Sequence, residues 1–254
     1  VIVIDKSGLR SMQPLEVVEP RRCVFEYVYF ARPDSNIADQ NVYKVRVNMG
    51  RELARENPLE ADIVVPIPDS GNCAALGYAL ESGIPFEMAF VRNHYVGRSF
   101  LQPSQLIRDF NVRVKLNLIT DLVKGKRVII VDDSIVRGTT SEKIVAMVRA
   151  AGASEVHMRI SSPPTKNSCF YGIDTPEQEQ LLASRLDVAA IADHISADSL
   201  AFITMDGLYR AVGEAARNDE SPQFCDACFS GDYPIELSDQ IGGSRPAQLS
   251  LLTE

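Results

Sequence analysis

The chain has 254 residues, of which 45% are hydrophobic and 24% are charged, so it holds enough apolar material for one sizeable core. Its formal net charge of -8 excludes a protein whose main role is to coat nucleic acid, because that role requires a broad cationic face. No run approaches the ~20 consecutive apolar residues that cross a bilayer, and the N-terminus lacks the pattern of a signal peptide. These features predict a cytoplasmic protein that binds neither membranes nor nucleic acid.

The first two thirds of the chain predict alternating strands and helices. Residues 23–31 are rich in aromatic and β-branched side chains, which is typical of a strand, and residues 37–56 carry apolar positions at helical spacing. Short apolar runs predict further strands, at residues 63–67, 86–91, 127–131 and 155–160. Helices are expected to end near Gly83 and to span about 140–151. This alternation predicts an α/β fold, with a parallel twisted sheet and helices on both faces.

Past residue 161 the pattern weakens to short helical segments and a tail with little periodicity. The segments lie at about 176–183, 186–194 and 206–216. In parallel sheets of this kind, ligands bind beyond the carboxyl ends of the strands. The loops after residues 67, 91 and 131 are therefore the candidate ligand-binding loops.

The run VIIVDDSIVRGTT, residues 128–140, joins a buried strand to a glycine turn and the start of a helix. Thr139 and Thr140 with Glu142 predict a helix N-terminus with a capping box, and the free N–H groups of such a terminus favour an anion. Gly138 permits a positive φ and a close approach of the backbone to phosphate oxygens. The run therefore predicts a phosphate site.

Asp132 and Asp133 are adjacent, so in an extended chain they are expected to point to opposite sides, which suits the two hydroxyls of a ribose better than a shared proton. Two other interpretations compete with this one. Any strand, turn and capped helix can end in acidic and hydroxyl residues. Receiver domains also carry paired acids, but they need another acid after the next strand, and residues 155–160 lead into Ser161-Ser162-Pro163 instead.

The run at residues 128–140 resembles the 5-phosphoribosyl-1-pyrophosphate motif of type I phosphoribosyltransferases. Three other segments extend the resemblance: VPIPDS at 65–70, RNHYVGRSF at 92–100 and CFYGID at 169–174. Together, from about residue 9 to residue 233, the chain resembles the phosphoribosyltransferase half of the amidophosphoribosyltransferase family. The resemblance implies that ammonia displaces pyrophosphate from the activated ribose to give phosphoribosylamine, the first committed step of purine biosynthesis.

The resemblance also implies which residues form the site. Substrate-binding residues would be Asp69, Ser70, Gly71, Asp132, Asp133, Ser134, Ile135, Val136, Arg137, Gly138, Thr139 and Thr140. Mg²⁺ would lie near Ser70, Asp132 and Asp133. Catalytic roles fall to Arg92, Tyr95 and Arg98.

Residues 92–117 form a long connection without a predicted element, and loops of this length in compact domains are often lids. A lid would exclude water, which competes with ammonia at the anomeric carbon. A plain solvated loop is the alternative. Of the three histidines, His94 lies in this segment and is a candidate substrate contact, whereas His157 and His194 are expected to be structural.

Five cysteines at uneven spacing are unlike a secreted disulfide framework and favour a reducing compartment. Cys225 and Cys228 form a CxxC pair, which zinc, iron–sulfur and redox sites all use. The family resemblance implies that Cys23 and Cys169 join this pair as the ligands of a [4Fe–4S] cluster. Zinc and a set of free buried cysteines remain open, and Cys73 is expected to be a core residue.

Val1 is not a methionine, and the first residues already alternate like a strand, so the sequence is expected to begin within a longer polypeptide. The resemblance implies three parts: residues 1–20 as a linker from an absent N-terminal glutaminase domain, 21–216 as the phosphoribosyltransferase domain, and 217–254 as a tail that packs back on it. The chain alone is then expected to use ammonia but not glutamine.

The resemblance further implies feedback by purine nucleotides and a homo-oligomer, a dimer or a tetramer. Two other functions remain. One is a phosphoribosyltransferase that uses a nucleobase, and the other is a regulator that senses phosphoribosyl pyrophosphate. The acidic composition weighs against a nucleic-acid-binding regulator.

Overall fold

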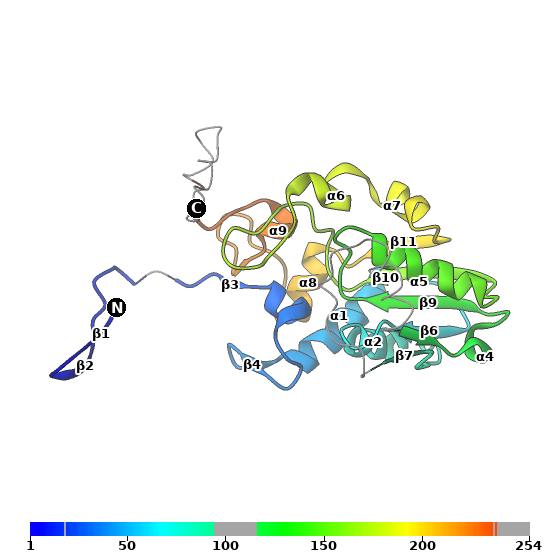
Figure 1. The fold of residues 1–254 in the computed structure, drawn as a ribbon, viewed down its shortest axis with the longest axis horizontal. Coiled ribbons are helices and arrows are strands. Elements are labelled where there is room, and N and C mark those ends of the chain that lie inside the picture. The colour runs from blue at the N-terminus through cyan, green and yellow to red at the C-terminus, as the bar shows by residue number, and fades with distance from the viewer. Residues whose placement is uncertain (18, 94–115, 236, 238–254) are drawn as a thin grey trace, which may run out of the picture.

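A computed structural model describes residues 1–17, 19–93, 116–235 and 237 (Figure 1). A four-stranded parallel sheet with the strand order β11-β10-β9-β6 forms its centre. The strands are β6 (Ile63–Pro66), β9 (Arg127–Asp132), β10 (Glu155–Ile160) and β11 (Ser199–Phe202). Asp132 at the end of β9 is in register with Ile160, and Val131 is in register with Pro66. The carboxyl ends of the central strands therefore meet at one edge of the sheet.

Helices cover both faces of this sheet, as the sequence predicted (Figure 1). One face is covered by α1 (Val42–Glu56), α2 (Asn72–Ser82) and α8 (Met205–Ala211). The other is covered by α4 (Thr120–Val123), α5 (Thr139–Ala150), α6 (Leu182–Arg185) and α7 (Val188–His194). Side chains of β9 alternate between the faces: Ile129 and Val131 pack toward the first, and Val128 and Ile130 toward the second.

Smaller pairings complete the fold. The hairpin of β1 (Ile2–Asp5) and β2 (Gly8–Ser11) extends away from the domain in Figure 1. The remaining pairs are β3 (Arg22–Cys23) with β12 (Phe224–Cys225), β4 (Asn36–Ile37) with β5 (Gln40–Asn41), and β7 (Phe90–Arg92) with β8 (Leu116–Leu118). A 3₁₀ turn, η3 (Gln178–Gln180), precedes α6, and α9 (Ala227–Ser230) follows β12. Within the described ranges, no helix combines the length and apolar character needed to cross a bilayer.

The predicted strand at residues 23–31 is wrong. Only Arg22–Cys23 is a strand, and Glu26–Phe30 forms the π-helix η1. The side chain of Arg46 on α1 donates from Nε to the carbonyl of Tyr27 (2.7 Å) and from Nη2 to that of Ala31 (2.8 Å). These bonds satisfy carbonyl groups that strand pairing would otherwise have to satisfy, so the segment is stable without a neighbouring strand.

Three other elements differ from the prediction in extent. The first long helix begins at Val42, because Asn41 caps it through a hydrogen bond from the Lys44 amide (3.2 Å). In the run at 86–91, Phe86 makes only an isolated bridge to Val64, and the paired strand starts at Phe90. The helix predicted at 206–216 ends at Ala211, and strand β11 was not predicted.

Candidate active site

The two aspartates lie where the sequence placed them, at the carboxyl end of β9. Asp132 is the last residue of the strand and Asp133 follows it, and the two residues are only 8% and 7% exposed. Oδ1 of Asp132 accepts a hydrogen bond from the backbone N–H of Asp133 (2.9 Å). Two carboxyl groups are thus buried side by side at the edge where parallel sheets bind ligands.

Burial raises the pKa of Asp132 well above its ordinary value, and repulsion by the Asp133 carboxylate raises it further. Burial also raises the pKa of Asp133, although hydrogen bonds from Ser134 and Ser70 and the positive charge of Arg46 oppose the shift. A hydrogen bond between the two carboxyl groups contributes to both pKa values. The expectation that the side chains point to opposite sides is therefore wrong, because the chain turns immediately after Asp132.

The loop between β6 and α2 joins this site, as predicted. The Ile67 amide donates to the Val131 carbonyl (2.9 Å) and the Gly71 amide to the Ile67 carbonyl (2.9 Å), which ties the loop to the end of β9. The Ser70 side chain then comes near enough to the Asp133 carboxyl to lower its pKa. Ser70, Asp132 and Asp133 thus gather hard oxygen donors of the kind that Mg²⁺ prefers.

The turn into α5 differs in its capping from the prediction. Gly138 is the N-cap residue with φ 78° and makes no side-chain cap, so the capping box of Thr139, Thr140 and Glu142 is absent. The Glu142 amide donates instead to the Gly138 carbonyl (2.9 Å). Both threonines are exposed and stand with the unbonded N–H groups of the first helical turn, which is favourable for an anion.

The side chains in the middle of this turn do not share one environment. Ser134 donates to the Asp133 carboxyl (2.5 Å), and Arg137 is exposed. Ile135 packs in the apolar core on the α5 face, and Val136 lines a separate cavity described below. If Ile135 and Val136 bind a substrate, as predicted, they can therefore offer it only their backbone groups.

Arg92, at the end of β7, pairs with Asp69 in the β6–α2 loop. Both side chains are about half exposed, at 47% and 57%. Tyr95, Arg98 and His94 lie outside the described residues, so their predicted roles remain predictions. Arg92 is in register with Leu116, so the strands on either side of the undescribed segment pair with each other.

The four predicted cysteine ligands line one cavity. They are Cys23, Cys169, Cys225 and Cys228. Pairing of β3 with β12 puts Cys23 and Cys225 in register, and the other two enter from the loop after β10 and from α9. Burial raises the pKa of Cys23 to about 11, and the neighbouring Cys225 and Cys169 thiols raise it as well. Cys225, Ala227, Cys228 and Tyr233 therefore meet the domain at this cavity.

The thiols do not form a closed metal site as they stand. Among the described residues, no group of three His, Cys, Asp or Glu side chains is arranged to hold a metal ion. The wall of the cavity nevertheless includes Thr165, whose buried Oγ1 has no hydrogen-bond partner in the described part of the chain. Four soft thiols and an unpaired hydroxyl fit a thiolate-ligated metal or an iron–sulfur cluster in their chemistry.

The remaining predicted residues are structural. Cys73 is buried within α2. His157 contacts Ser199 Oγ (3.0 Å) and Glu155 Oε2 (3.0 Å) on the sheet, remote from the loops of the site. His194 ends α7 and lies near the turn that precedes α5, because a Cβ atom on Gly138 would be 3.5 Å from its Cδ2 atom.

Sequence reasoning missed three residues that shape the two sites. Arg46 is buried on α1 and supplies positive charge near Asp133. Leu182 holds the turn that precedes α5 through a hydrogen bond from its amide to the Val136 carbonyl (2.8 Å). Thr165 lines the thiol cavity. The only one of these residues that the sequence could have indicated is Arg46, because it is a charged residue among the apolar positions of its helix. The other two act through contacts between distant segments, which leave no local pattern.

Several known proteins that are similar to this chain are amidophosphoribosyltransferases. Amidophosphoribosyltransferase of Rhizobium etli is 56% identical over 246 residues, which cover 96% of this chain and 50% of that protein. Chloroplastic amidophosphoribosyltransferase 1 of Arabidopsis thaliana is 51% identical over 236 residues, which cover 93% of this chain and 41% of that protein. The chain spans about half the length of the curated relatives it matches.

A solved structure of glutamine phosphoribosylpyrophosphate amidotransferase from B. subtilis, complexed with ADP and GMP, has a TM-score of 0.82 to this fold. It is 48% identical and covers 94% of this chain and 52% of its own. These similarities confirm the resemblance inferred from the motifs and the type I phosphoribosyltransferase fold.

The family model for the phosphoribosyl transferase domain matches residues 36–169, more than half of the chain. That region contains the β6–α2 loop, the paired aspartates and the turn into α5. The chain belongs to the phosphoribosyl transferase domain family.

Proposed function

We propose that this chain transfers the phosphoribosyl group of 5-phosphoribosyl-1-pyrophosphate to ammonia, giving 5-phosphoribosylamine and pyrophosphate. The nitrogen lone pair forms the new bond to the anomeric carbon, the bond to the pyrophosphate oxygen breaks, and the attacking nitrogen loses a proton. The observation that carries the proposal is the meeting of Ser70 with buried Asp132 and Asp133 beyond parallel strands. The similarity to amidophosphoribosyltransferases supports the acceptor.

The roles of the residues follow from the charges of the substrate. Asp132 and Asp133 would bind the ribose hydroxyls and, with Ser70, hold Mg²⁺. The turn through Gly138 into Thr139 and Thr140 would bind the 5-phosphate with backbone N–H and hydroxyl groups, aided by Ser134 and Arg137 and by the backbone of Ile135 and Val136. Bound Mg²⁺ supplies positive charge that offsets the charge on the departing pyrophosphate.

The loop of Asp69, Ser70 and Gly71 would bind the pyrophosphate, and Arg92 would exchange its pairing with Asp69 for the pyrophosphate oxygens. No protein nucleophile is needed, so positioning and charge neutralisation account for the catalysis. Tyr95 and Arg98 would act from the segment between β7 and β8, which would exclude water on closure.

The direct test is incubation of the chain with phosphoribosyl pyrophosphate, Mg²⁺ and ammonium, with release of pyrophosphate as the measurement. Turnover that depends on ammonium supports the proposal. Turnover only with a nucleobase would identify a different phosphoribosyltransferase, and binding without turnover would identify a sensor. Replacement of Asp132 and Asp133 by alanine together should abolish the heat of substrate binding in calorimetry.

We further propose that the four cysteines hold a [4Fe–4S] cluster that ties the tail to the domain. The convergence of the thiols on one cavity with the unpaired Thr165 hydroxyl supports this assignment. Iron and sulfide in the anaerobically purified chain, with a brown colour, are the expected result. Stoichiometric zinc without sulfide would contradict the cluster.

The wider properties of the relatives are proposals for this chain as well. Use of glutamine in place of ammonia would require a glutaminase domain. The B. subtilis enzyme was solved in complex with ADP and GMP, which supports inhibition by purine nucleotides. We also propose a homo-oligomer, and a domain division of residues 1–20, 21–216 and 217–254.

A further inference from the structure

We propose that Asp226 is a positioning residue for the thiol site. It directly follows Cys225, the first cysteine of the CxxC pair. Its buried carboxylate would hold the turn from Cys225 to Cys228 in the geometry that metal or cluster binding requires. This inference rests on the proposed role of the four cysteines.

The carboxylate of Asp226 is only 1% exposed, and both of its oxygens are hydrogen-bonded. Oδ2 accepts from the Tyr209 hydroxyl (2.7 Å) and from Arg217 Nε (2.7 Å), and Oδ1 accepts from the Ser230 hydroxyl (2.7 Å). These partners come from three parts of the fold: α8, the loop after it, and the end of α9. The carboxylate therefore fastens the turn to the main domain.

The backbone of Asp226 also shapes the turn. Its carbonyl accepts from the Phe229 amide (2.8 Å) and the Ser230 amide (3.0 Å), which folds the chain around Cys228. Cys225 is fixed separately by the pairing of β12 with β3. The backbone that bears Cys225 and Cys228 is thus held in place at Asp226.

The four thiols line one cavity, so a metal or cluster held by all four requires each of them to keep its place there. Cys225 and Cys228 stand at the two ends of the turn that Asp226 holds. Residues behind metal ligands that fix their orientation typically contribute a factor of about 10 to 100 in metal affinity.

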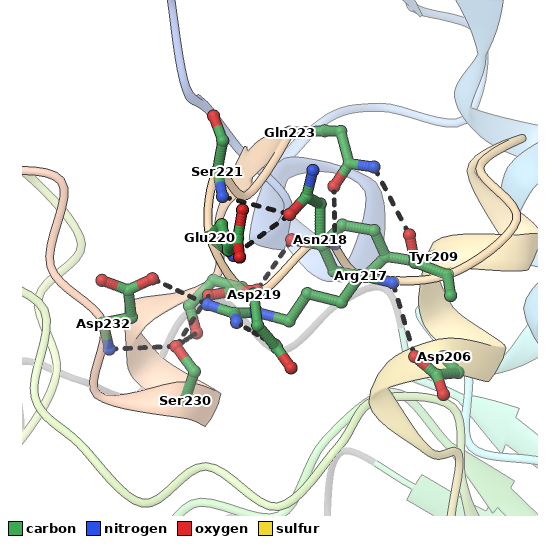
Figure 2. A network of polar contacts seen from close by, with 12 residues as sticks. Asp206, Tyr209, Arg217, Asn218, Asp219, Glu220, Ser221, Gln223, Ser230 and Asp232 are labelled. Carbon is green, nitrogen blue, oxygen red and sulfur yellow. Dashed lines mark hydrogen bonds and ion pairs between the residues drawn. The ribbon is translucent and has the colours of Figure 1, made fainter.

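Arg217 offers an internal comparison, since it pairs with three carboxylates. Its nitrogens contact Asp219 (2.5 Å), Asp226 (2.7 Å) and Asp232 (2.8 Å). Figure 2 shows Asp219, Ser230 and Asp232 gathered around the guanidinium. Asp219 is 88% exposed and lies outside the turn, so it shares the arginine with Asp226 without touching the cysteine backbone.

The test compares Asp226→Asn with Asp219→Asn in the anaerobically purified chain. An iron chelator is added, and loss of the visible absorbance of the cluster is followed over time. We expect Asp226→Asn to lose iron about 10-fold faster than the unchanged chain or more, and Asp219→Asn to stay within about twofold. Equal rates for Asp226→Asn and the unchanged chain would overturn the proposal.

A control separates positioning from general loss of stability. Gly77→Ala should loosen the packing of α1 on α2, far from the turn in the sequence and in the fold. If Gly77→Ala releases iron as fast as Asp226→Asn, positioning by Asp226 is wrong. If Asp226→Asn does not fold, Arg217→Lys takes its place, because lysine keeps the positive charge but loses the paired N–H groups that contact Asp226. The rates of iron release are then compared in the same way.

The outcomes also distinguish this inference from the proposal beneath it. An unchanged chain that holds neither iron nor zinc after anaerobic reconstitution with Fe²⁺ and sulfide would refute the thiol site itself. An unchanged chain that holds metal, with Asp226→Asn equally retentive, would refute only the role of Asp226. Zinc in place of iron leaves the comparison intact, with zinc release measured by a colorimetric chelator.

Discussion

The hydroxyl of Ser70 and the carboxyl of Asp133 come from two different strand-to-helix loops, yet they lie close enough for Ser70 to lower the pKa of that carboxyl. The contact joins the loop after β6 to the end of β9. It exists because parallel pairing puts Pro66 and Val131 in register, so both loops leave the sheet at the same edge. The proposed metal site therefore depends on strand register rather than on any local motif.

Asp132 should destabilise the metal-free fold at neutral pH, because its pKa is raised by burial and by Asp133. A group with a raised pKa in the folded state favours folding below its ordinary pKa near 3.8, and this contribution is lost as the pH rises through the folded pKa. Asp132→Asn should therefore melt at a higher temperature than the unchanged chain at pH 7.5, with a difference that shrinks toward acid pH. Thermal denaturation in EDTA from pH 4.5 to 8 measures this.

Activity should change in the opposite direction, since the Asn variant loses the charge proposed to hold Mg²⁺. Addition of Mg²⁺ with substrate should raise the melting temperature of the unchanged chain and not that of the variant. A variant that is less stable than the unchanged chain at every pH would contradict the assignment of a costly buried carboxylate.

The sequence predicted the centre of the fold well for a physical reason. The runs that became β6 and β9 are buried on both faces, so they are continuous apolar segments with clear ends. In β10 the apolar residues alternate with His157 and Arg159, which are also buried. Strand β11 was missed because Ser199-Leu200-Ala201-Phe202 is short and mixed. The π-helix η1 was taken for a strand because its aromatic composition suits either element, and only the contact with Arg46 decides between them.

The candidate site likewise has a part that the sequence predicted and a part that it did not. Asp132, Asp133 and Ser70 belong to family motifs, and parallel strands alone place their loops at the same edge of the sheet. The inward turn of both aspartates could not be foreseen, because it follows from the bend after β9. Arg46 and Thr165 reach the sites from segments with no motif, so their roles depend on packing between residues distant in the sequence.

Arg92 should contribute more to turnover than to stability. Its ion pair with Asp69 is about half exposed, and such pairs contribute about 0 to 1 kcal/mol to the free energy of unfolding. Loss of a charge that contacts pyrophosphate should lower kcat/KM by about 100-fold or more. Arg92→Ala is therefore expected to melt close to the unchanged chain but release pyrophosphate far more slowly.

Arg55→Ala is the matched control for that measurement. Arg55 forms an ion pair with Glu81 and is 53% exposed, but it lies on α1 away from the loops of the site. Its loss should leave pyrophosphate release unchanged. Equal activity of the Arg92 and Arg55 variants would remove Arg92 from the proposed site.

Arg46 should be irreplaceable by lysine, although lysine keeps the positive charge. A lysine ammonium cannot bond both the Tyr27 and Ala31 carbonyls with the geometry of a guanidinium. Loss of one such charged hydrogen bond costs about 1.5 to 3 kcal/mol. Arg46→Lys is expected to unfold at a lower urea concentration, whereas Lys44→Ala, at an exposed position of the same helix, should not. Coincident unfolding curves for both variants would show that the two carbonyl contacts contribute little.

Gly77 lies where α2 crosses α1, and a Cβ atom there would be 1.9 Å from the carbonyl oxygen of Val47. Helix propensity alone favours alanine over glycine by about 1 kcal/mol, so a gain in stability would be expected at an open helical position. Here backbone would have to move apart, and overpacking of this kind costs about 1 to 3 kcal/mol or more. Gly77→Ala should therefore unfold at a lower urea concentration, while Leu80→Ala, at an exposed position of α2, should change little. A more stable Gly77→Ala variant would mean that α1 and α2 can move apart without lowering the free energy of unfolding. The packing of these helices would then not hold the loop before α2 against β9.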